Sequence, residues 1–348
     1  MKIALIELSE SHEECLYSQV QFIGLNNPNV HLYLNPKVAL QVEGYGLDKK
    51  QIFETQFDGG FFKRWSYAFY LAKTLGKYDR LVFNTASSSK LLRNLLILLN
   101  FYSVVSIGVL HNTKKLGSSF TQRLVSTKIK KYLVLSDHLT NPPNLKKGIR
   151  LQSFYPIYFP DYNDFLEKPE DETWLVIPGS IDFKRRDYLR LLDSLYDRPV
   201  ISKLKIILLG RLNDSFEDGR GLLEAISKRK LNHYFVTFES FVANKTFHSY
   251  VGKADFIMPL LALNDDYLNY KISGSFNMAF AYKKYMLTHK FYGSLPDLSE
   301  NSVFYDESNL YDQLCNLKTV SVTKHIYQNE KWHFGFQKKR YLDFLLSE

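Results

Sequence analysis

Residues 174–195 read WLVIPGSIDFKRRDYLRLLDSL, and this stretch decides the fold class. An apolar strand at 174–177 runs into a Pro-Gly-Ser turn, and the basic cluster Lys184-Arg185-Arg186 then opens an amphipathic helix. A turn holding Gly179 and Ser180 lets backbone N–H groups approach an anion, and a helix start adds partial positive charge. Fixed cations beside such a turn favour a diphosphate ligand. The competing interpretation is a plain βα unit whose basic residues are solvated.

The same strand-then-helix pattern recurs on both sides of this stretch. Before it, we predict strands at 2–8, 29–35, 79–85, 104–112 and 131–137, with helices between them. A segment with three prolines and an acidic run, 149–174, interrupts the pattern, which then restarts with the strand that begins at 174. The alternation predicts an α/β protein with two Rossmann-like, doubly wound domains facing a cleft. The expected parts are an acceptor-binding domain at 1–155, a linker at 156–172, a nucleotide-sugar domain at 173–330, and a C-terminal helix at 331–348 that crosses back to the first domain.

Charge is distributed unevenly along the 348 residues, whose net charge is +9. Residues 61–131 hold 13 Lys or Arg and one acid, Asp79. Such a surface predicts an anionic partner, either a membrane or a nucleic acid. No recognised nucleic-acid motif is present, so we expect no nucleic-acid partner and an anionic membrane surface bound through residues 61–131. The aromatic run 61–65 and the Leu-rich helix 91–102 would form the interfacial surface, unless the Leu-rich run is simply core.

The remaining composition favours a cytoplasmic protein, peripheral at the inner membrane face. No apolar run is long enough to span a bilayer. The two cysteines, Cys15 and Cys315, show no metal-ligand spacing and no disulfide framework. We find no HExxH motif and no Cys/His cluster, and therefore expect no metal.

Four stretches of the second half carry a resemblance to a known family. They are VIPGSIDFKRRDYLRLL (176–192), KIILLGR (205–211), ESFVANKTFHSYVGKADFIMPLL (239–261) and KISGSFNMAFAYKKYML (271–287). In order and character they resemble the nucleotide-sugar domain of GT-B-fold glycosyltransferases of the family-1/4 type. The resemblance implies a UDP- or GDP-linked sugar as donor substrate and no bound cofactor. It departs from the retaining members at Ser180, where they have arginine, and in the late helix, which lacks their two glutamates.

The donor site is expected at the carboxyl ends of the second-half strands. Ser273-Gly274-Ser275 is a second phosphate turn, for which an ordinary serine cap is the alternative. Glu239 is a substitute for the missing ribose-binding glutamate. The predicted donor-binding residues are Gly179, Ser180, Lys184, Arg185, Gly210, Arg211, Glu239, Lys271, Ser273, Gly274 and Ser275.

Candidate catalytic groups follow two strands of the first half. Inverting sugar transfer needs a base that takes the proton of the acceptor hydroxyl. His12 or Glu13, directly after the first strand, supplies that base; the alternative is that Ser11-His12-Glu13-Glu14 is only a helix cap. His111, which ends a strand, is a third candidate. The sequence thus predicts a metal-independent glycosyltransferase that acts on a lipid-linked or polysaccharide acceptor in surface-glycan biosynthesis. A non-catalytic partner subunit and a nucleotide-sugar epimerase on the same scaffold remain alternatives.

Overall fold

The computed structural model describes residues 1–24, 27–87, 89–143, 145–162, 166–212, 217–320 and 326–347. The chain divides into two compact units. Unit 1 comprises Met1–Pro160, Asn269–Ile272 and Glu330–Glu348, and unit 2 comprises Asp161–Leu268 and Ser273–Asn329. The second half of the chain therefore contributes two segments to unit 1, Asn269–Ile272 and Glu330–Glu348.

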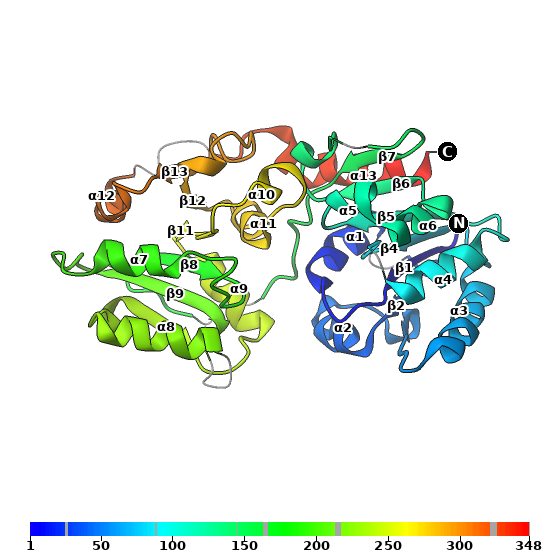
Figure 1. Ribbon diagram of the computed structural model, residues 1–348, viewed down its shortest axis with the longest axis horizontal. Helices are drawn as coiled ribbons and strands as arrows, with labels where there is room; N and C mark the ends of the chain where they lie inside the picture. The colour runs from blue at the N-terminus through cyan, green and yellow to red at the C-terminus, as the bar shows by residue number, and fades with distance from the viewer. Residues whose placement is uncertain are drawn as a thin grey trace. The chain divides into compact units, whose positions relative to one another are not determined.

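Unit 1 is built on a parallel sheet that has seven strands among the described residues (Figure 1). The strand order is β3-β2-β1-β4-β5-β6-β7, so the direction of winding reverses between β1 and β4. Every strand pair is parallel, and the interior strands are apolar on both faces, as helix-covered strands must be. The strands are β1 Ile3–Glu7, β2 Val30–Leu34, β3 Ile52–Glu54, β4 Arg80–Phe83, β5 Val105–Leu110, β6 Lys131–Val134 and β7 Arg150–Ser153.

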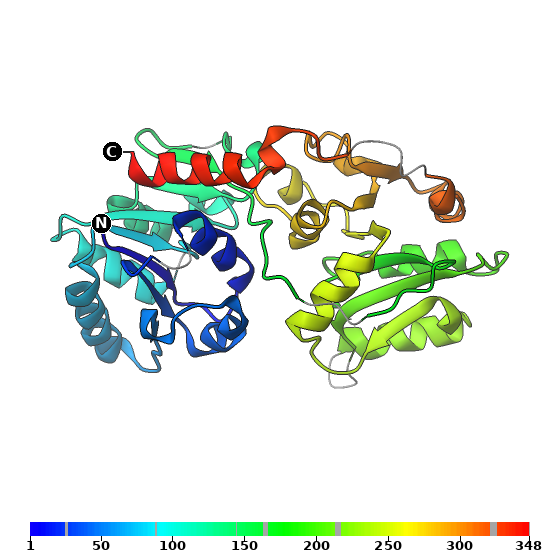
Figure 2. The ribbon, with the colours of Figure 1, turned by 180° about the vertical axis from the view of Figure 1, so that it is seen from behind.

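Helices cover both faces of this sheet (Figures 1 and 2). On one face α3, α4 and α6 pack side by side and bury a Leu- and Ala-rich core. On the other face α1 packs against the C-terminal helix α13, and α2 adds Val38 to the same core. The helices are α1 Leu16–Ile23, α2 Pro36–Gln41, α3 Phe61–Leu75, α4 Lys90–Leu99, α5 Lys114–Ser118, α6 Phe120–Lys128 and α13 Phe334–Leu346.

Unit 2 repeats the arrangement with a six-stranded parallel sheet in its described part, in the order β10-β9-β8-β11-β12-β13. Its winding reverses between β8 and β11. The strands are β8 Thr173–Pro178, β9 Leu204–Arg211, β10 Phe235–Phe238, β11 Phe256–Ile257, β12 Tyr285–His289 and β13 Ser302–Tyr305. The helices are α7 Tyr188–Leu195, α8 Glu217–Lys228, α9 Asn244–Lys253, α10 Asp266–Asn269, α11 Gly274–Ala281 and α12 Leu310–Asn316. Two parallel, doubly wound sheets confirm the predicted fold class.

Several local expectations differ from the structure. The basic cluster 184–186 does not open a helix: α7 begins at Tyr188, and its cap is Asp187, whose side chain accepts a hydrogen bond from Arg190 N. The Leu-rich helix α4 is core, because Leu92, Leu95, Leu96 and Leu99 are buried. Ser89 caps α4, whereas the other candidate, Ser88, lies outside the described residues. The short strands β3 and β7 carry too few apolar residues to be read from the sequence.

Within the described ranges, we find no helix that combines the length and the apolar character needed to cross a bilayer.

Candidate functional site

The winding of the first sheet brings three polar residues to one edge. Two of them, His12 and His111, are predicted catalytic residues, and the third is Asn84. In doubly wound sheets, ligands bind beyond the carboxyl ends of the strands, where the winding reverses. In unit 1 that point lies between β1 and β4. His12 follows β1, Asn84 follows β4, and His111 follows the next strand, β5. The imidazole rings of His12 and His111 stack with centroids 3.7 Å apart.

His12 forms a hydrogen-bonded dyad with Glu14. Nδ1 of His12 lies 3.2 Å from Oε1 of Glu14. Burial alone would lower the pKa of His12, but the hydrogen bond and negative charge of Glu14 outweigh burial and raise it. Burial would raise the pKa of Glu14, but the hydrogen bond with His12 and the charge of His12 outweigh burial and lower it. An ionised Glu14 accepts from Nδ1–H, which leaves Nε2 of a neutral His12 as the proton acceptor.

Glu13 is next to Glu14 in the chain but is not the partner of His12 in this dyad. The structure sets Glu14 against the imidazole, whereas the sequence favoured His12 or Glu13 as the base. The pKa of Glu13 is raised, first by burial and then by the charge of Glu14. The alternative interpretation, a helix cap at Ser11, is not what the structure shows. His12 occupies the capping position of the short helix Glu13–Cys15, with no side-chain cap bond. His12 adopts a left-handed backbone with φ 74°, a conformation that is costly for a residue with a Cβ.

His111 is held neutral and in a defined orientation. Its Nε2 lies 2.9 Å from the backbone carbonyl O of Asn84, so Nε2 carries the proton and donates it. Burial, followed by the charge of His12, lowers the pKa of His111 to about 4. A neutral ring stacked on His12 supports the position of that ring without competing for its proton.

Beneath the histidines lies a polar network centred on Glu7, a residue that the sequence did not single out. The carboxylate of Glu7 is fully buried and accepts hydrogen bonds from Asn84 Nδ2 (2.8 Å), Thr85 Oγ1 (2.6 Å) and Ser9. Burial raises the pKa of Glu7 in spite of these bonds. Asn84 Nδ2 also donates to the backbone O of His12 (2.8 Å). Asn84 therefore joins β1, β4 and both histidines. The sequence feature that could have indicated this network is Glu7 itself, an acidic residue at the end of an apolar strand.

Potential ligand atoms of His12, Glu14 and His111 lie within 4.8 Å of one another, close enough for the three to surround one metal ion. The lone pairs of an imidazole lie in the ring plane, however, and the two rings are nearly parallel, at 22°. Stacked rings do not aim their lone pairs at a common point. His12 Nδ1 and His111 Nε2 are also engaged by Glu14 and by Asn84 O. The arrangement suits proton exchange better than metal binding.

In unit 2 the point of winding reversal is filled by Arg186. Its side chain is 6% exposed and donates to the carbonyl oxygens of Pro178, at the end of β8, and Pro259, just beyond β11. It also donates to Ser180 O (3.3 Å) and to Ser275 Oγ (3.3 Å), in the first turn of α11. Arg186 thus ties two central strand ends to a helix start, and it is the structural member of the basic cluster.

The other two cations of that cluster lie on the surface. Lys184 and Arg185 are exposed, as is Ser180 in the turn before them. The turn is held tightly by two glycines. Gly179 has φ +105°, and a Cβ on it would lie 2.8 Å from Arg186 Nη2. A Cβ on Gly210 would collide with the carbonyl O of Gly179, so Gly210 allows β9 to approach the turn.

The second predicted phosphate turn is a capped helix start. The side chain of Ser273 accepts from Ser275 N (3.3 Å) and caps α11. Ser275 Oγ donates to Pro178 O (3.2 Å), so its hydroxyl serves packing. Gly274 is exposed, with open space around its Cα. Lys271 belongs to the segment Asn269–Ile272 of unit 1. Arg211 and Glu239 are exposed where β9 and β10 end.

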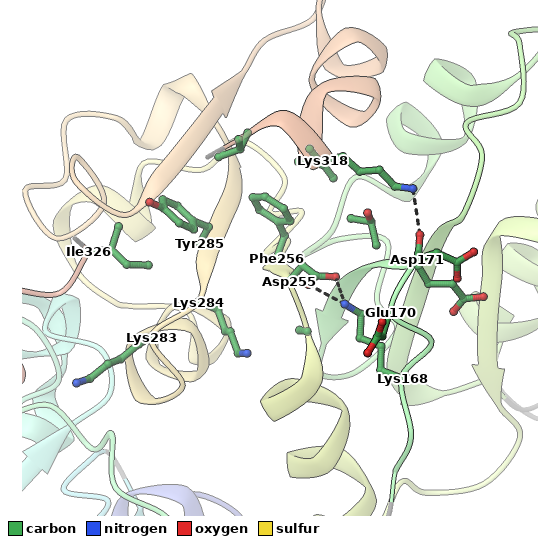
Figure 3. Close-up of a pocket in the computed structure, with 15 residues that line it drawn as sticks. Lys168, Glu170, Asp171, Asp255, Phe256, Lys283, Lys284, Tyr285, Lys318 and Ile326 are labelled. Atoms are coloured by element: carbon green, nitrogen blue, oxygen red, sulfur yellow. Dashed lines mark hydrogen bonds and ion pairs between the residues drawn. The ribbon is translucent and has the colours of Figure 1, made fainter. Parts of the chain in front are cut away.

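Two cavities help to locate binding surfaces. In unit 2, a cavity of about 630 Å³ lies at the amino ends of β8, β11 and β12, bordered by Thr173, Phe256 and Tyr285 (Figure 3). Its charges are mixed, and Lys168 is paired with Asp255. It lies at the end of the sheet opposite the predicted phosphate turns, so it does not belong to the candidate site.

In unit 1, a cavity of about 410 Å³ lies just beyond β5. The backbone N of Thr113, two residues after His111, donates to Tyr270 O (2.8 Å), and Lys114 Nζ lies 5.6 Å from the Tyr270 ring centroid. Seven residues line this cavity: Thr113, Lys114, Leu116, Gly117, Ser118, Pro142 and Tyr270.

Solved structures with the same fold cover nearly the whole chain. HepE of Anabaena in complex with UDP-glucose superposes with a TM-score of 0.67 at 13% identity, over 99% of this chain and 99% of that chain. A glycosyltransferase from Rickettsia africae gives 0.64 at 11% identity, over 99% and 94%. The UDP-GlcNAc 2-epimerase of Neisseria meningitidis bound to UDP-GlcNAc gives 0.66 at 10% identity, over 100% of both chains. No family model and no curated protein matches the sequence. The chain therefore has the architecture of GT-B-type glycosyltransferases and these epimerases.

Proposed function

We propose that this protein is a glycosyltransferase that moves a sugar from a UDP- or GDP-linked donor to a lipid-linked or polysaccharide acceptor in surface-glycan biosynthesis. The observation that carries the proposal is the dyad of His12 and Glu14 at the winding reversal of unit 1. The GT-B architecture supports it, since HepE and the Neisseria epimerase share the fold and were solved with UDP-glucose and UDP-GlcNAc. The closer family-1/4 relationship stays a prediction.

In this proposal the dyad activates the acceptor. Nε2 of neutral His12 takes the proton of the acceptor hydroxyl as the hydroxyl oxygen forms the new bond to the sugar carbon. Glu14 holds the ring through Nδ1–H and stabilises the imidazolium that results. His111 supports the ring from its stacked position. In the proposed step the acceptor oxygen attacks the face of the sugar carbon opposite the leaving phosphate, so the reaction inverts that carbon.

The leaving nucleoside diphosphate is assigned to unit 2. Negative charge grows on the phosphate as the glycosidic bond breaks, and nearby cations stabilise that charge. Lys184 and Arg185 are the exposed cations beside the Gly179 turn, and the N-terminus of α11 adds the partial positive charge of a helix start. These groups replace a metal ion in the mechanism, which is therefore metal-independent.

The acceptor sugar is assigned to the unit 1 cavity beyond β5. Its Tyr270 ring offers an apolar face for a sugar ring, and Thr113, Lys114 and Ser118 offer polar groups at its border. The cavity begins two residues after His111, so an acceptor there lies on the edge of the sheet that carries the dyad. We place the reaction in the cytoplasm, with no nucleic-acid partner.

A nucleotide-sugar epimerase is the second candidate, because the 2-epimerase of Neisseria meningitidis covers the whole chain at a TM-score similar to that of HepE. A base at His12 could also remove a proton from a sugar carbon. A binding subunit without chemistry is less consistent with an ordered, pKa-shifted dyad.

Two measurements test the proposal. First, the melting temperature is recorded with UDP, GDP, CMP and dTDP for the wild type and Arg185→Ala. Ligand at about 100 times its Kd adds roughly 2.7 kcal/mol, which shifts melting by several degrees. We expect a shift with UDP or GDP that the variant loses.

Second, the fate of the nucleotide sugar is followed with and without acceptor glycan. A transferase releases nucleoside diphosphate in proportion to glycosylated acceptor, and His12→Ala abolishes both. A 2-epimer formed from the donor without acceptor would instead establish the epimerase. Binding of nucleotide with neither product would leave the non-catalytic subunit as the answer.

A further inference from the structure

One helix of unit 1 presents aromatic side chains to solvent. In α3, Phe62 is 85% exposed, Phe69 60% and Tyr70 62%. Their spacing, with Ser66 and Lys73 between and after them, puts all of them on one face of the helix. The opposite face is buried against α4 and holds Ala68, Leu71, Ala72 and Leu75. Large aromatic residues gathered on one solvent face mark an interaction surface, unlike scattered single ones.

The charged residues within α3 all have one sign. The helix sequence FFKRWSYAFYLAKTL contains Lys63, Arg64 and Lys73 and no acid, and Lys77 follows its last turn. The C-terminal end adds to the surface: Gly76 lies against the ring of Tyr102, whose neighbour Phe101 is 85% exposed. We call the exposed residues Phe62, Ser66, Phe69, Tyr70, Lys73, Lys77 and Phe101 the α3 face.

We propose that the α3 face is a docking surface for an anionic lipid bilayer, on which α3 lies parallel to the membrane plane. Phenylalanine and tyrosine side chains enter the region below the headgroups, while the lysines meet anionic headgroups. This inference goes beyond the proposed function, since it concerns a surface that shares no residue with the dyad and does not depend on the reaction.

Charge favours a bilayer over a second copy of this chain. Two α3 faces packed together would bury Lys73 and Lys77 of both copies, and α3 itself offers no acid to pair with them. Protein interfaces are also depleted in lysine at their centres. The structure narrows the interfacial region expected from sequence, because the leucines of α4 are core whereas Phe62, Phe69 and Tyr70 of α3 are exposed.

The test uses the full chain and sedimentation with vesicles of phosphatidylglycerol and phosphatidylcholine, against phosphatidylcholine alone. We expect binding to the anionic vesicles only, weakened by salt. Phe62→Ser/Phe69→Ser and Lys73→Glu/Lys77→Glu should each lower the partition coefficient by about tenfold or more. Leu40→Ser is the matched control: Leu40 is 68% exposed but lies on α2, on the other face of the sheet, and should leave binding unchanged. Equal binding by the wild type and both double variants would overturn the proposal, as would the absence of wild-type binding.

A second readout does not require a binding-deficient variant. Trp65 lies in α3 and is half-buried, whereas Trp174 and Trp332 are buried. Lipids brominated in their acyl chains should quench the fluorescence of the bound protein, and Trp65→Phe should remove that quenching while binding persists. Binding without Trp65 quenching would mean that another surface docks, and would overturn the assignment to α3.

Discussion

At the scale of single residues, the candidate base depends on one carboxylate. Glu14 raises the pKa of His12 against the effect of burial, so Glu14→Gln should lower that pKa. The base must be unprotonated, and activity therefore rises with pH through the pKa of His12. The acidic limb of kcat/KM should move to lower pH by roughly one unit, and kcat should fall about 100-fold. A pH–rate profile of both proteins measures this.

Glu13→Gln is the control for that experiment. The charge of Glu13 raises the pKa of His12 less than Glu14 does, so the Glu13 variant should keep most of kcat and shift the acidic limb less. Equal shifts in the two variants would show that general negative charge, and not the dyad, sets the pKa of His12.

Also at the residue scale, two neighbouring arginines should differ in what they do. Arg186→Met leaves the carbonyls of Pro178 and Pro259 without their buried donor and should lower the free energy of unfolding by about 2–4 kcal/mol. Arg185→Ala removes an exposed side chain and should change it by less than about 0.5 kcal/mol. Thermal and denaturant unfolding measure both. Equal stability of the two variants would contradict the structural role of Arg186.

At the scale of elements, glycine is required in one predicted phosphate turn and not in the other. The turn from β8 toward α7 needs Gly179, whereas the start of α11 does not need Gly274. Gly179→Ala forces a Cβ onto φ +105° and against Arg186, and should cost more than about 1 kcal/mol of stability. Gly274→Ala meets open space at a helix start and should leave the melting temperature unchanged or slightly higher. If both substitutions are tolerated alike, the turn is not strained as described.

At the scale of the whole molecule, the C-terminal helix completes unit 1. Tyr341 of α13 is fully buried, packs against Phe22 of α1, and donates to Gln19 Oε1 (3.1 Å). Tyr341→Ala should destabilise unit 1 by about 3–5 kcal/mol, whereas Tyr341→Phe loses one hydrogen bond, about 1 kcal/mol. Hydrogen exchange read by peptide should show faster exchange in α1 of Tyr341→Ala and no change in α7 and α8. Faster exchange in α7 as well would contradict this assignment.

The sequence predicted those residues of the candidate site that directly follow a recognisable strand. His12 and His111 follow apolar strands, and parallel strands present their carboxyl ends at one edge, so the sequence placed both on that edge. Their stacking, and the choice of Glu14 over Glu13, depend on the left-handed turn at His12, which no sequence pattern indicates. The hydrogen bond between Glu7 and Asn84 was not predictable, because residues 77 apart in the chain meet only in the folded sheet.

The sequence by itself determined the α/β class, the restart of the pattern at 174, and the concentration of positive charge in residues 61–131, because periodicity and composition are local properties of the chain. The tertiary structure alone decided which groups are buried and which meet. It buried Arg186 against two strand ends and left Lys184 and Arg185 exposed; it made α4 core and turned the aromatic face of α3 outward. The physical reason is that the winding order and packing of a sheet, not the neighbours along the chain, set which side of each helix and turn loses its contact with water.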